Sequence, residues 1–74
     1  MGKLRVLSGL DVCKILEKNE FQEMRRKGSH IVMQRKTGRS TTTIPVPDHK
    51  ELASGTLRSI IRQSGLSKGL FEND

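Results

Sequence analysis

The tripeptide Gly28-Ser29-His30 carries the residue types in this sequence that are best suited to chemistry on a phosphate group. It follows three consecutive basic residues, Arg25-Arg26-Lys27. Glycine lets a backbone approach a ligand closely, and a serine hydroxyl donates to a phosphoryl oxygen. An imidazole has an unperturbed pKa of about 6.5 and therefore exchanges a proton near neutral pH, while neighbouring cations stabilise a pentavalent transition state. The segment favours phosphoryl chemistry with His30 as the proton acceptor, although such tripeptides also occur in ordinary exposed turns.

The basic charge of the chain is concentrated around this tripeptide. The 74 residues include 14 Lys and Arg against 8 Asp and Glu, and no acidic residue lies between Met24 and Val46. Cations neutralise a phosphate backbone without reading its sequence, so we expect broad nucleic-acid contact that weakens steeply with salt. The alternative is a rim of solvated cations that protects a sheet edge from aggregation. The candidate nucleic-acid-binding residues are Arg25, Arg26, Lys27, Gly28, Ser29, Arg35 and Lys36.

Other kinds of site lack the residues that they need. The one cysteine and two histidines, at positions 13, 30 and 49, do not have metal-ligand spacing, so we expect neither a metal nor another cofactor. The sequence contains no phosphate-loop motif and no dinucleotide-binding fingerprint. With two Phe and neither Trp nor Tyr, it also disfavours a surface that stacks bases on exposed aromatic rings.

The residues that precede the basic segment predict an amphipathic helix. Ser8 and Asp11 have the spacing of a capping pair, so the helix should begin near Gly9 and end at Asn19. Spacings of three and four predict one buried stripe, which comprises Leu10, Val12, Cys13, Ile15 and Leu16. Cys13 is accordingly interpreted as a small buried hydrophobic residue and not as a catalytic thiolate.

Short β-rich segments separated by glycines replace the helical pattern in the middle of the chain. The expected strands are residues 21–27, 30–35 and 40–46. Gly28 and Gly38 fall in the two hairpin turns between them. Pro45 and Pro47 cannot donate backbone hydrogen bonds, so the third strand should end there or lie at an edge of the sheet.

A second helix is predicted after a short polar segment. Its expected core residues are Leu57, Ile60 and Ile61. Ser54 or Thr56 should cap its start, and Gly65 should end it.

A last short turn is expected beyond the second helix. Ser67 should cap this turn, which should bury Leu70 and Phe71. Residues 73 and 74 should fray at the end of the chain.

These elements predict an α+β fold of order α-β-β-β-α. A three-stranded antiparallel sheet should be covered on one face by both helices, because no other segment can cover its apolar side. A chain of 74 residues has enough apolar surface for only one hydrophobic core, so we expect a single domain over residues 1–74. One cysteine cannot form an intrachain disulfide. No apolar run is long enough to span a membrane, and no leader sequence is evident. We therefore expect a cytoplasmic protein without a membrane partner.

Several motifs together resemble the HicA toxin family. They are Gly28-Ser29-His30, Ile44-Pro45-Val46-Pro47 with His49, Leu52, and the run GTLRSIIRQSGL over residues 55–66. The resemblance covers nearly the whole chain and implies a double-stranded-RNA-binding-domain-like fold. It also implies the toxin of a type II toxin–antitoxin system, an mRNA interferase that cuts transcripts and is held inactive by a HicB-type antitoxin. The functional histidine of the family falls on His30.

The resemblance and the residue types together favour metal-independent cleavage of RNA. His30 would take the proton from a 2′-OH that attacks the adjacent phosphorus, and His49, Lys27 or water would serve as general acid. An acidic antitoxin would mask His30 and the basic face. Glu20 stands where many relatives have glycine and would weaken substrate contact at that edge. A non-catalytic RNA-binding module and a small DNA-binding or ribosomal accessory protein stay open as alternatives.

Overall fold

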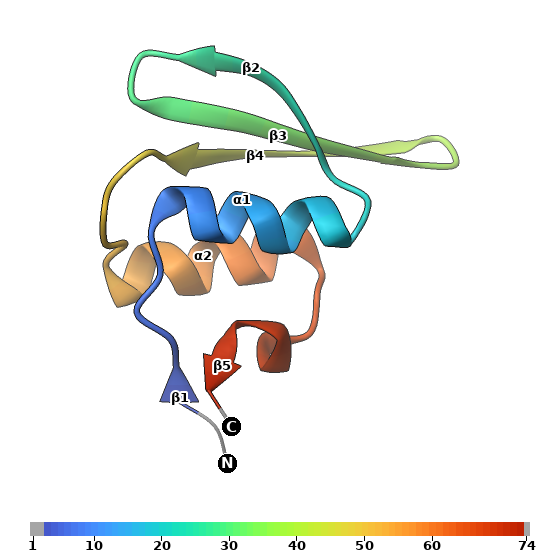
Figure 1. Ribbon diagram of the computed structural model, residues 1–74. Coiled ribbons are helices and arrows are strands. Elements are labelled where there is room, and N and C mark those ends of the chain that lie inside the picture. The colour runs from blue at the N-terminus through green and yellow to red at the C-terminus, as the bar shows by residue number, and fades with distance from the viewer. Residues whose placement is uncertain (1–2, 74) are drawn as a thin grey trace.

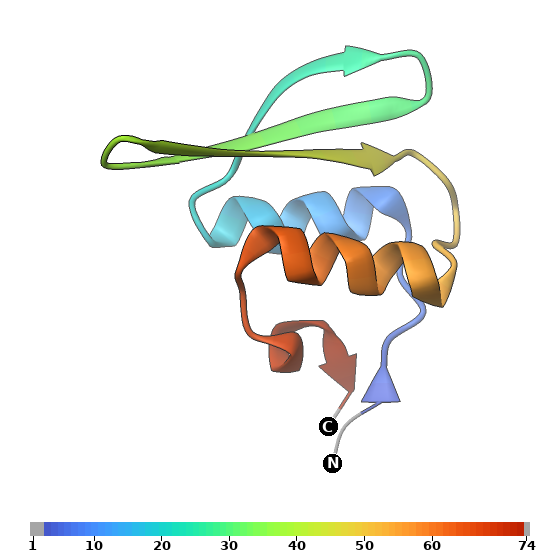
Figure 2. The same ribbon diagram turned by 180° about the vertical axis from the view of Figure 1, so that it is seen from behind.

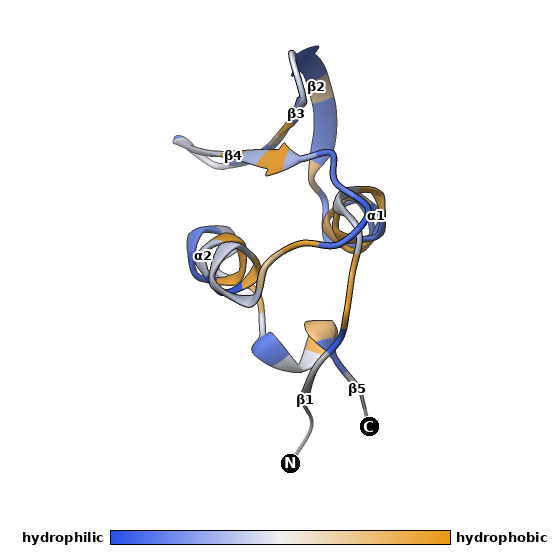
Figure 3. Cartoon of the chain, turned by 90° about the vertical axis from the view of Figure 1, so that its left-hand side faces the viewer, coloured by the Kyte–Doolittle hydropathy of each residue, from blue (hydrophilic) through white to orange (hydrophobic). Residues whose placement is uncertain are grey.

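The computed structural model describes residues 3–73 of the chain, and the side chains of residues 5–72. Figures 1 and 2 show a sheet, a pair of helices beneath it, and a small terminal layer on the far side of the helices. The main elements are α1 (Gly9–Lys18), β2 (Gln22–Lys27), β3 (His30–Thr37), β4 (Ser40–Pro47) and α2 (Ser54–Ser64). Both helices lie on the same side of the sheet (Figure 3). The predicted α+β class and the order α-β-β-β-α are therefore confirmed.

Helix α1 has the start and the end that the sequence predicts. The Ser8 hydroxyl accepts a hydrogen bond from the Asp11 backbone N–H, and the Asp11 carboxylate accepts one from the Ser8 backbone N–H. The hydrogen bond from the Ser8 backbone N–H lowers the pKa of Asp11, because it favours the charged carboxylate. Asn19 ends the helix as its C-cap.

The buried stripe of α1 is narrower than predicted. Val12, Cys13 and Leu16 are buried and Ile15 packs against the core, but Leu10 is 49% exposed. The expectation for Leu10 was wrong because it lies two residues from Val12, about 200° around the helix axis.

Helix α2 buries the predicted residues but begins without a side-chain cap. Leu57, Ile60 and Ile61 are all buried, and Gly65 ends the helix with a φ of +70°. The N-cap is Ala53, whose carbonyl oxygen accepts the first helical hydrogen bond from the Leu57 N–H. The prediction of Ser54 or Thr56 as the cap was wrong, since both residues already lie inside the first turn.

The three strands form an antiparallel sheet of order β2-β3-β4. β3 and β4 run two residues and one residue further than predicted, whereas β2 begins one residue later, after the buried Phe21. β4 is an edge strand, and it contains Pro45 and Pro47, as expected for residues that donate no backbone hydrogen bond. Gly28 and Gly38 occupy the hairpin turns with positive φ angles of 61° and 58°.

The hydrophobic core lies between the sheet and the helices. Ile31, Met33, Ile44 and Val46 of the sheet are fully buried and belong to one core cluster with the buried residues of both helices. Their neighbours in sequence are more exposed, which is the alternation of a sheet with one covered face. No helix within residues 3–73 is long and apolar enough to cross a membrane.

Segments near the two ends of the described chain form a small layer beneath the helix pair (Figure 1). β1 (Lys3–Leu4) pairs antiparallel with β5 (Glu72–Asn73), and η1 (Lys68–Phe71) is a short 3-10 helix beside them. The Arg5 N–H continues the pairing with a 2.9 Å bond to the Phe71 carbonyl oxygen. The expected fraying of Asn73 was wrong, because Asn73 pairs with Lys3, and Asp74 lies outside the described residues.

The last turn has the predicted cap but buries only one of the two expected residues. The Ser67 hydroxyl accepts a hydrogen bond from the Gly69 N–H, and Phe71 is fully buried. Leu70 is 43% exposed, because the tight turn directs its side chain away from the core that Phe71 enters.

The start of α1 packs directly on the end of β4. The Gly9 N–H donates to the His49 carbonyl oxygen at 2.9 Å. A Cβ atom at Gly9 would overlap the carbonyl oxygen of Pro47 and would also crowd the Cα atom of Asp48. Glycine is therefore required here by the close approach of two backbones.

We predict that Gly9→Ala destabilises the protein by about 1–3 kcal/mol, because the added methyl group forces a backbone shift. Gly55→Ala is the matched control, since a Cβ atom at this exposed helical glycine meets nothing within 4 Å. It should gain about 0.4–1 kcal/mol from helix propensity and reduced chain entropy. Urea unfolding monitored by circular dichroism measures both, and equal changes would contradict the close packing at Gly9.

Candidate functional site

The predicted catalytic residue His30 lies at the tip of the β2–β3 hairpin. Gly28 and Ser29 form a two-residue turn in which Gly28 alone has a positive φ, of +61°. A positive φ at the first turn position is typical of a type II′ hairpin, whose twist matches that of the flanking strands. His30 follows as the first residue of β3, and it is exposed.

His30 projects from the face of the sheet that the helices leave open. Its register partners are Lys27 on β2 and Pro47 on β4. Directly opposed residues of antiparallel strands share one face, and successive residues alternate between faces. Ile31 and Met33 point into the core, so His30 lies on the other face together with Lys27.

Two further cations share this open face. Arg25 opposes Val32, which has the same parity as His30, and Lys36 has this parity as well. The register shifts between Glu23 and Arg25 by a β-bulge, and this shift determines which of the consecutive basic residues face outward. The exposed basic residues of this face, the open-face cations, are Arg25, Lys27 and Lys36.

Arg26 faces the helices and is paired. It opposes the buried Ile31, and its Nη1 atom lies 2.7 Å from Oδ2 of Asp48. This hydrogen bond raises the pKa of Arg26, because it stabilises the charged guanidinium. The two side chains are 50% and 34% exposed, so solvent screens their charges and the pair contributes little to stability. Its geometry nonetheless joins β2 to the loop that follows β4.

Arg35 also faces the helices and serves the packing of α2. Its Nη2 atom donates to the carbonyl oxygen of Ser64 at 3.2 Å, and its guanidinium carbon lies 4.8 Å from the centre of the Phe21 ring. A cation is stabilised at this position because carbonyl groups converge at the C-terminus of a helix. The Nε atom of Arg35 is buried and has no hydrogen-bond partner among the described residues.

The loop after β4 holds the hairpin turn in place. The Asp48 N–H donates to the Ser29 carbonyl oxygen at 2.7 Å, while the Asp48 carboxylate holds Arg26. The next residue, His49, accepts the backbone bond from Gly9 and is itself exposed. The turn that carries His30 is therefore hydrogen-bonded to the β4–α2 loop, and this loop is in turn hydrogen-bonded to the start of α1.

Two other residues singled out in the sequence have clear structural settings. Cys13 is buried, and burial raises the pKa of its thiol to about 11, with a further contribution from Glu23 and Glu17. It is therefore not a thiolate at neutral pH. Glu20 is exposed and has a φ of +74°, a backbone conformation that favours glycine.

The structure thus divides the predicted RNA-binding residues into two groups. Gly28, Ser29 and the open-face cations lie on or beside the face that carries His30, whereas Arg26 and Arg35 are engaged on the helix side. Sequence reasoning missed the contacts of Asp48 with the hairpin. One signal was visible, since Asp48 is the first acidic residue after the long segment without any. Among the described residues, no group of three or more His, Cys, Asp or Glu is arranged to hold a metal ion.

A comparison with protein families identifies one match. The family described as the HicA toxin of bacterial toxin–antitoxin systems matches residues 9–66. The matched span runs from the first residue of α1 to just beyond α2, and it includes the whole three-stranded sheet. No curated protein and no solved structure matches the chain.

We predict that Arg35→Ala lowers the free energy of unfolding by about 1–2 kcal/mol, through loss of the contacts with Phe21 and the end of α2. Arg35→Lys should recover only part of this loss, because an ammonium group cannot stack as a planar guanidinium does. Arg39→Ala, in the exposed β3–β4 turn, is the control and should change stability by less than about 0.5 kcal/mol. Denaturant unfolding measures all three, and an unchanged Arg35→Ala protein would refute a packing role.

Proposed function

Since the chain belongs to the HicA toxin family of bacterial toxin–antitoxin systems, we propose that it is an endoribonuclease that cuts messenger RNA and thereby arrests translation. The proposal combines this membership with one structural observation. The imidazole of His30 is exposed on a face that also carries three cations, Arg25, Lys27 and Lys36. A proton acceptor beside positive charge is what cleavage of a phosphodiester requires.

The reaction that fits this arrangement is an internal transesterification. His30 accepts the proton of a ribose 2′-OH as its oxygen attacks the adjacent phosphorus. The bond from O2′ to phosphorus forms, the bond from phosphorus to O5′ breaks, and the leaving oxygen takes up a proton. The products are a 2′,3′-cyclic phosphate and a 5′-hydroxyl end. Because the nucleophile is the 2′-OH, DNA should not be cut.

The donor of the proton to O5′ is less constrained than the base. Lys27 is the direct register partner of His30, which supports it as general acid or as stabiliser of the transition-state charge. His49 lies one residue beyond the Asp48 contact with the hairpin, and it stays a candidate together with water.

We further propose that the partner of the chain is an acidic HicB-type antitoxin that covers His30 and the open-face cations. No carboxylate lies within 4 Å of these cations among the described residues, so their charge is available to such a partner. Complementary charge would speed the encounter and fix its orientation. Because its proposed substrate is messenger RNA, we propose that the protein acts in the cytoplasm. The double-stranded-RNA-binding-domain-like fold that the family resemblance implies stays a prediction.

We predict that His30→Ala abolishes growth arrest and RNA cleavage while changing the free energy of unfolding by less than about 0.5 kcal/mol. An exposed imidazole leaves neither a cavity nor an unpaired buried group when it is removed. The measurements are growth after induction, cleavage of a defined transcript in the presence of a chelator, and thermal unfolding. A folded His30→Ala protein that cuts RNA at the wild-type rate would contradict the assignment.

Ser40→Ala provides the matched control. Ser40 is the first residue of β4 and follows the second glycine turn, and His30 is likewise the first residue of β3 and follows the first glycine turn. It should keep full activity. Cleavage lost on chelation would contradict the metal-free reaction alone. A wild-type protein that binds the transcript and leaves it intact would favour the non-catalytic RNA-binding module.

We predict that replacing an open-face cation by Gln weakens RNA binding and flattens its salt dependence. Each of Arg25→Gln, Lys27→Gln and Lys36→Gln should lower the slope of log K against log salt by about 0.7 for single-stranded RNA. Fluorescence anisotropy with a labelled RNA measures this slope in a His30→Ala protein, which does not cut the probe.

Arg35→Gln and Arg62→Gln are the controls for this series. Arg35 is engaged with α2, and Arg62 lies on the exposed side of α2, so neither should change the salt slope. Loss of slope in Arg62→Gln equal to that in Lys27→Gln would instead place the RNA on the second helix.

A further inference from the structure

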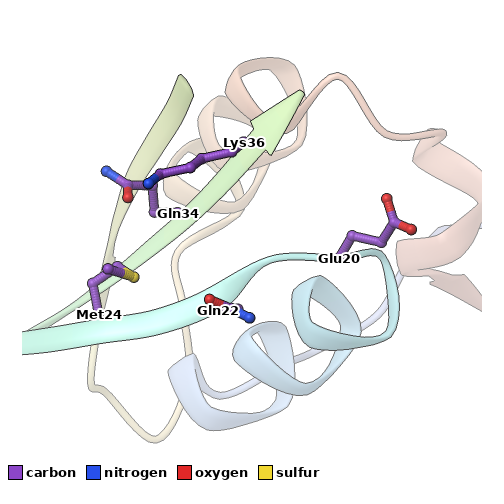
Figure 4. Close-up of a pocket in the computed structure, with 5 residues that line it drawn as sticks. All are labelled: Glu20, Gln22, Met24, Gln34 and Lys36. Atoms are coloured by element: carbon purple, nitrogen blue, oxygen red, sulfur yellow. The ribbon is translucent and has the colours of Figure 1, made fainter. Parts of the chain in front are cut away.

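The open face of the sheet is not uniformly charged beyond His30. Met24 on this face is 52% exposed, and Val32 is partly exposed. They line a surface hollow of about 400 Å³ together with Arg25, Gln34 and Thr43. A second hollow of about 300 Å³ adjoins it, since Met24 and Gln34 line both. Figure 4 draws this second hollow, with Gln22 and Met24 on β2, Gln34 and Lys36 on β3, and Glu20 at its far end.

The Gln34 side chain, which lines both hollows, makes one hydrogen bond across the sheet. Its Nε2 atom donates to the hydroxyl oxygen of Thr43, the directly opposed residue of β4, at 3.1 Å. The second N–H of the amide and its carbonyl oxygen have no partner among the described residues. An amide with one free donor and one free acceptor can form two hydrogen bonds with the edge of a base.

We infer that the hollow lined by Met24, Arg25, Val32, Gln34 and Thr43 binds one unpaired nucleobase of the RNA and makes the cleavage base-selective. This inference rests on the proposed endoribonuclease function and adds a determinant of its specificity. Met24 and Val32 form the apolar floor on which the base lies, and a thioether favours contact with aromatic rings. Gln34 hydrogen-bonds the edge of the base, and Arg25 meets a neighbouring phosphate.

The position of the hollow favours an RNA strand that also reaches His30. Gln34 follows His30 by four residues on β3, about 13 Å along the strand, and both project from the same face. The open-face cations surround this path. Glu20 ends it, because its negative charge repels phosphate at the far end of the second hollow.

The floor of the hollow explains how this face can hold a base without an aromatic side chain. Phe21, the one aromatic residue near the strands, is buried and stacked with Arg35, and it does not reach the open face. The selectivity should therefore come mainly from the Gln34 amide. Met24 should contribute affinity for any base.

The test compares variants on a pool of short single-stranded RNAs of randomised sequence. All binding is measured in the His30→Ala protein, so that the pool stays intact, and the bound fraction is sequenced. Gln34→Leu should reduce the enrichment of the preferred base by at least about five-fold. Met24→Ala should weaken binding of the whole pool about two- to ten-fold. In the active protein, Gln34→Leu should broaden the sequences found at cleaved bonds to the same extent.

Matched controls exist for both changes on the other side of the molecule. Gln63→Leu removes a glutamine whose amide also donates to a side-chain hydroxyl, that of Ser59 at 3.0 Å. Leu70→Ala shortens an apolar side chain that is 43% exposed, comparable to Met24. Both controls should leave base preference and affinity unchanged, and thermal unfolding confirms that all four variants fold.

Three results would overturn the inference. RNA that is bound and cut with the same base preference by Gln34→Leu would refute base reading while leaving the proposed function intact. Variants that weaken binding of the antitoxin but not of RNA would make the hollow a protein-contact surface. Absence of RNA binding and of RNA cleavage by the wild-type protein would refute the proposed function, and the base site with it.

Discussion

The backbone contact between the start of α1 and the end of β4 is the constraint on which the rest of the structure depends. Gly9 has no side chain, so its backbone reaches the Pro47 carbonyl group and donates to His49. Asp48, held between these two contacts, donates in turn to Ser29 in the β2–β3 turn. One junction therefore joins a helix terminus, the end of an edge strand and the turn that carries the candidate catalytic residue. A hairpin tip is usually among the more mobile parts of a small protein, and here the backbone hydrogen bond from Asp48 to Ser29 restrains it.

The alternation of the sheet divides the basic residues by role. Arg25, Arg26 and Lys27 are consecutive, but the bulge after Glu23 directs the first and third outward and the second toward the helices. The inward arginine finds a carboxylate, and the outward residues stay exposed. The cations with partners hold elements together, and those without partners are free to meet an anion. Composition alone cannot make this division, because it depends on the register.

Local signals in the sequence were sufficient for the element order, the capping pair of Ser8 and Asp11 and the glycine turn before His30. These features depend on a few adjacent residues, so their spacing is visible in the chain. The pairing of β1 with β5 was missed, because it joins segments about 70 residues apart in the chain. The cap of α2 at Ala53 was missed, because this helix begins without the side-chain hydrogen bond that a sequence pattern can indicate. The roles of Asp48 and Arg35 were missed because each contacts residues that lie far away in the chain, Arg26 for Asp48 and both Phe21 and Ser64 for Arg35.

One face of the sheet is buried in the core and stabilises the fold, whereas the other face is exposed and can bind a partner. The inner face supplies Ile31, Met33, Ile44 and Val46 to a core that has almost no redundancy in a chain of 74 residues. The outer face contributes little apolar burial, so its residues can change without loss of the fold. The unpaired cations there repel one another, and this repulsion is relieved when a polyanion or an acidic protein covers them. The RNA and the acidic antitoxin proposed as partners would therefore bind through the same charges, and their binding to this face would be mutually exclusive.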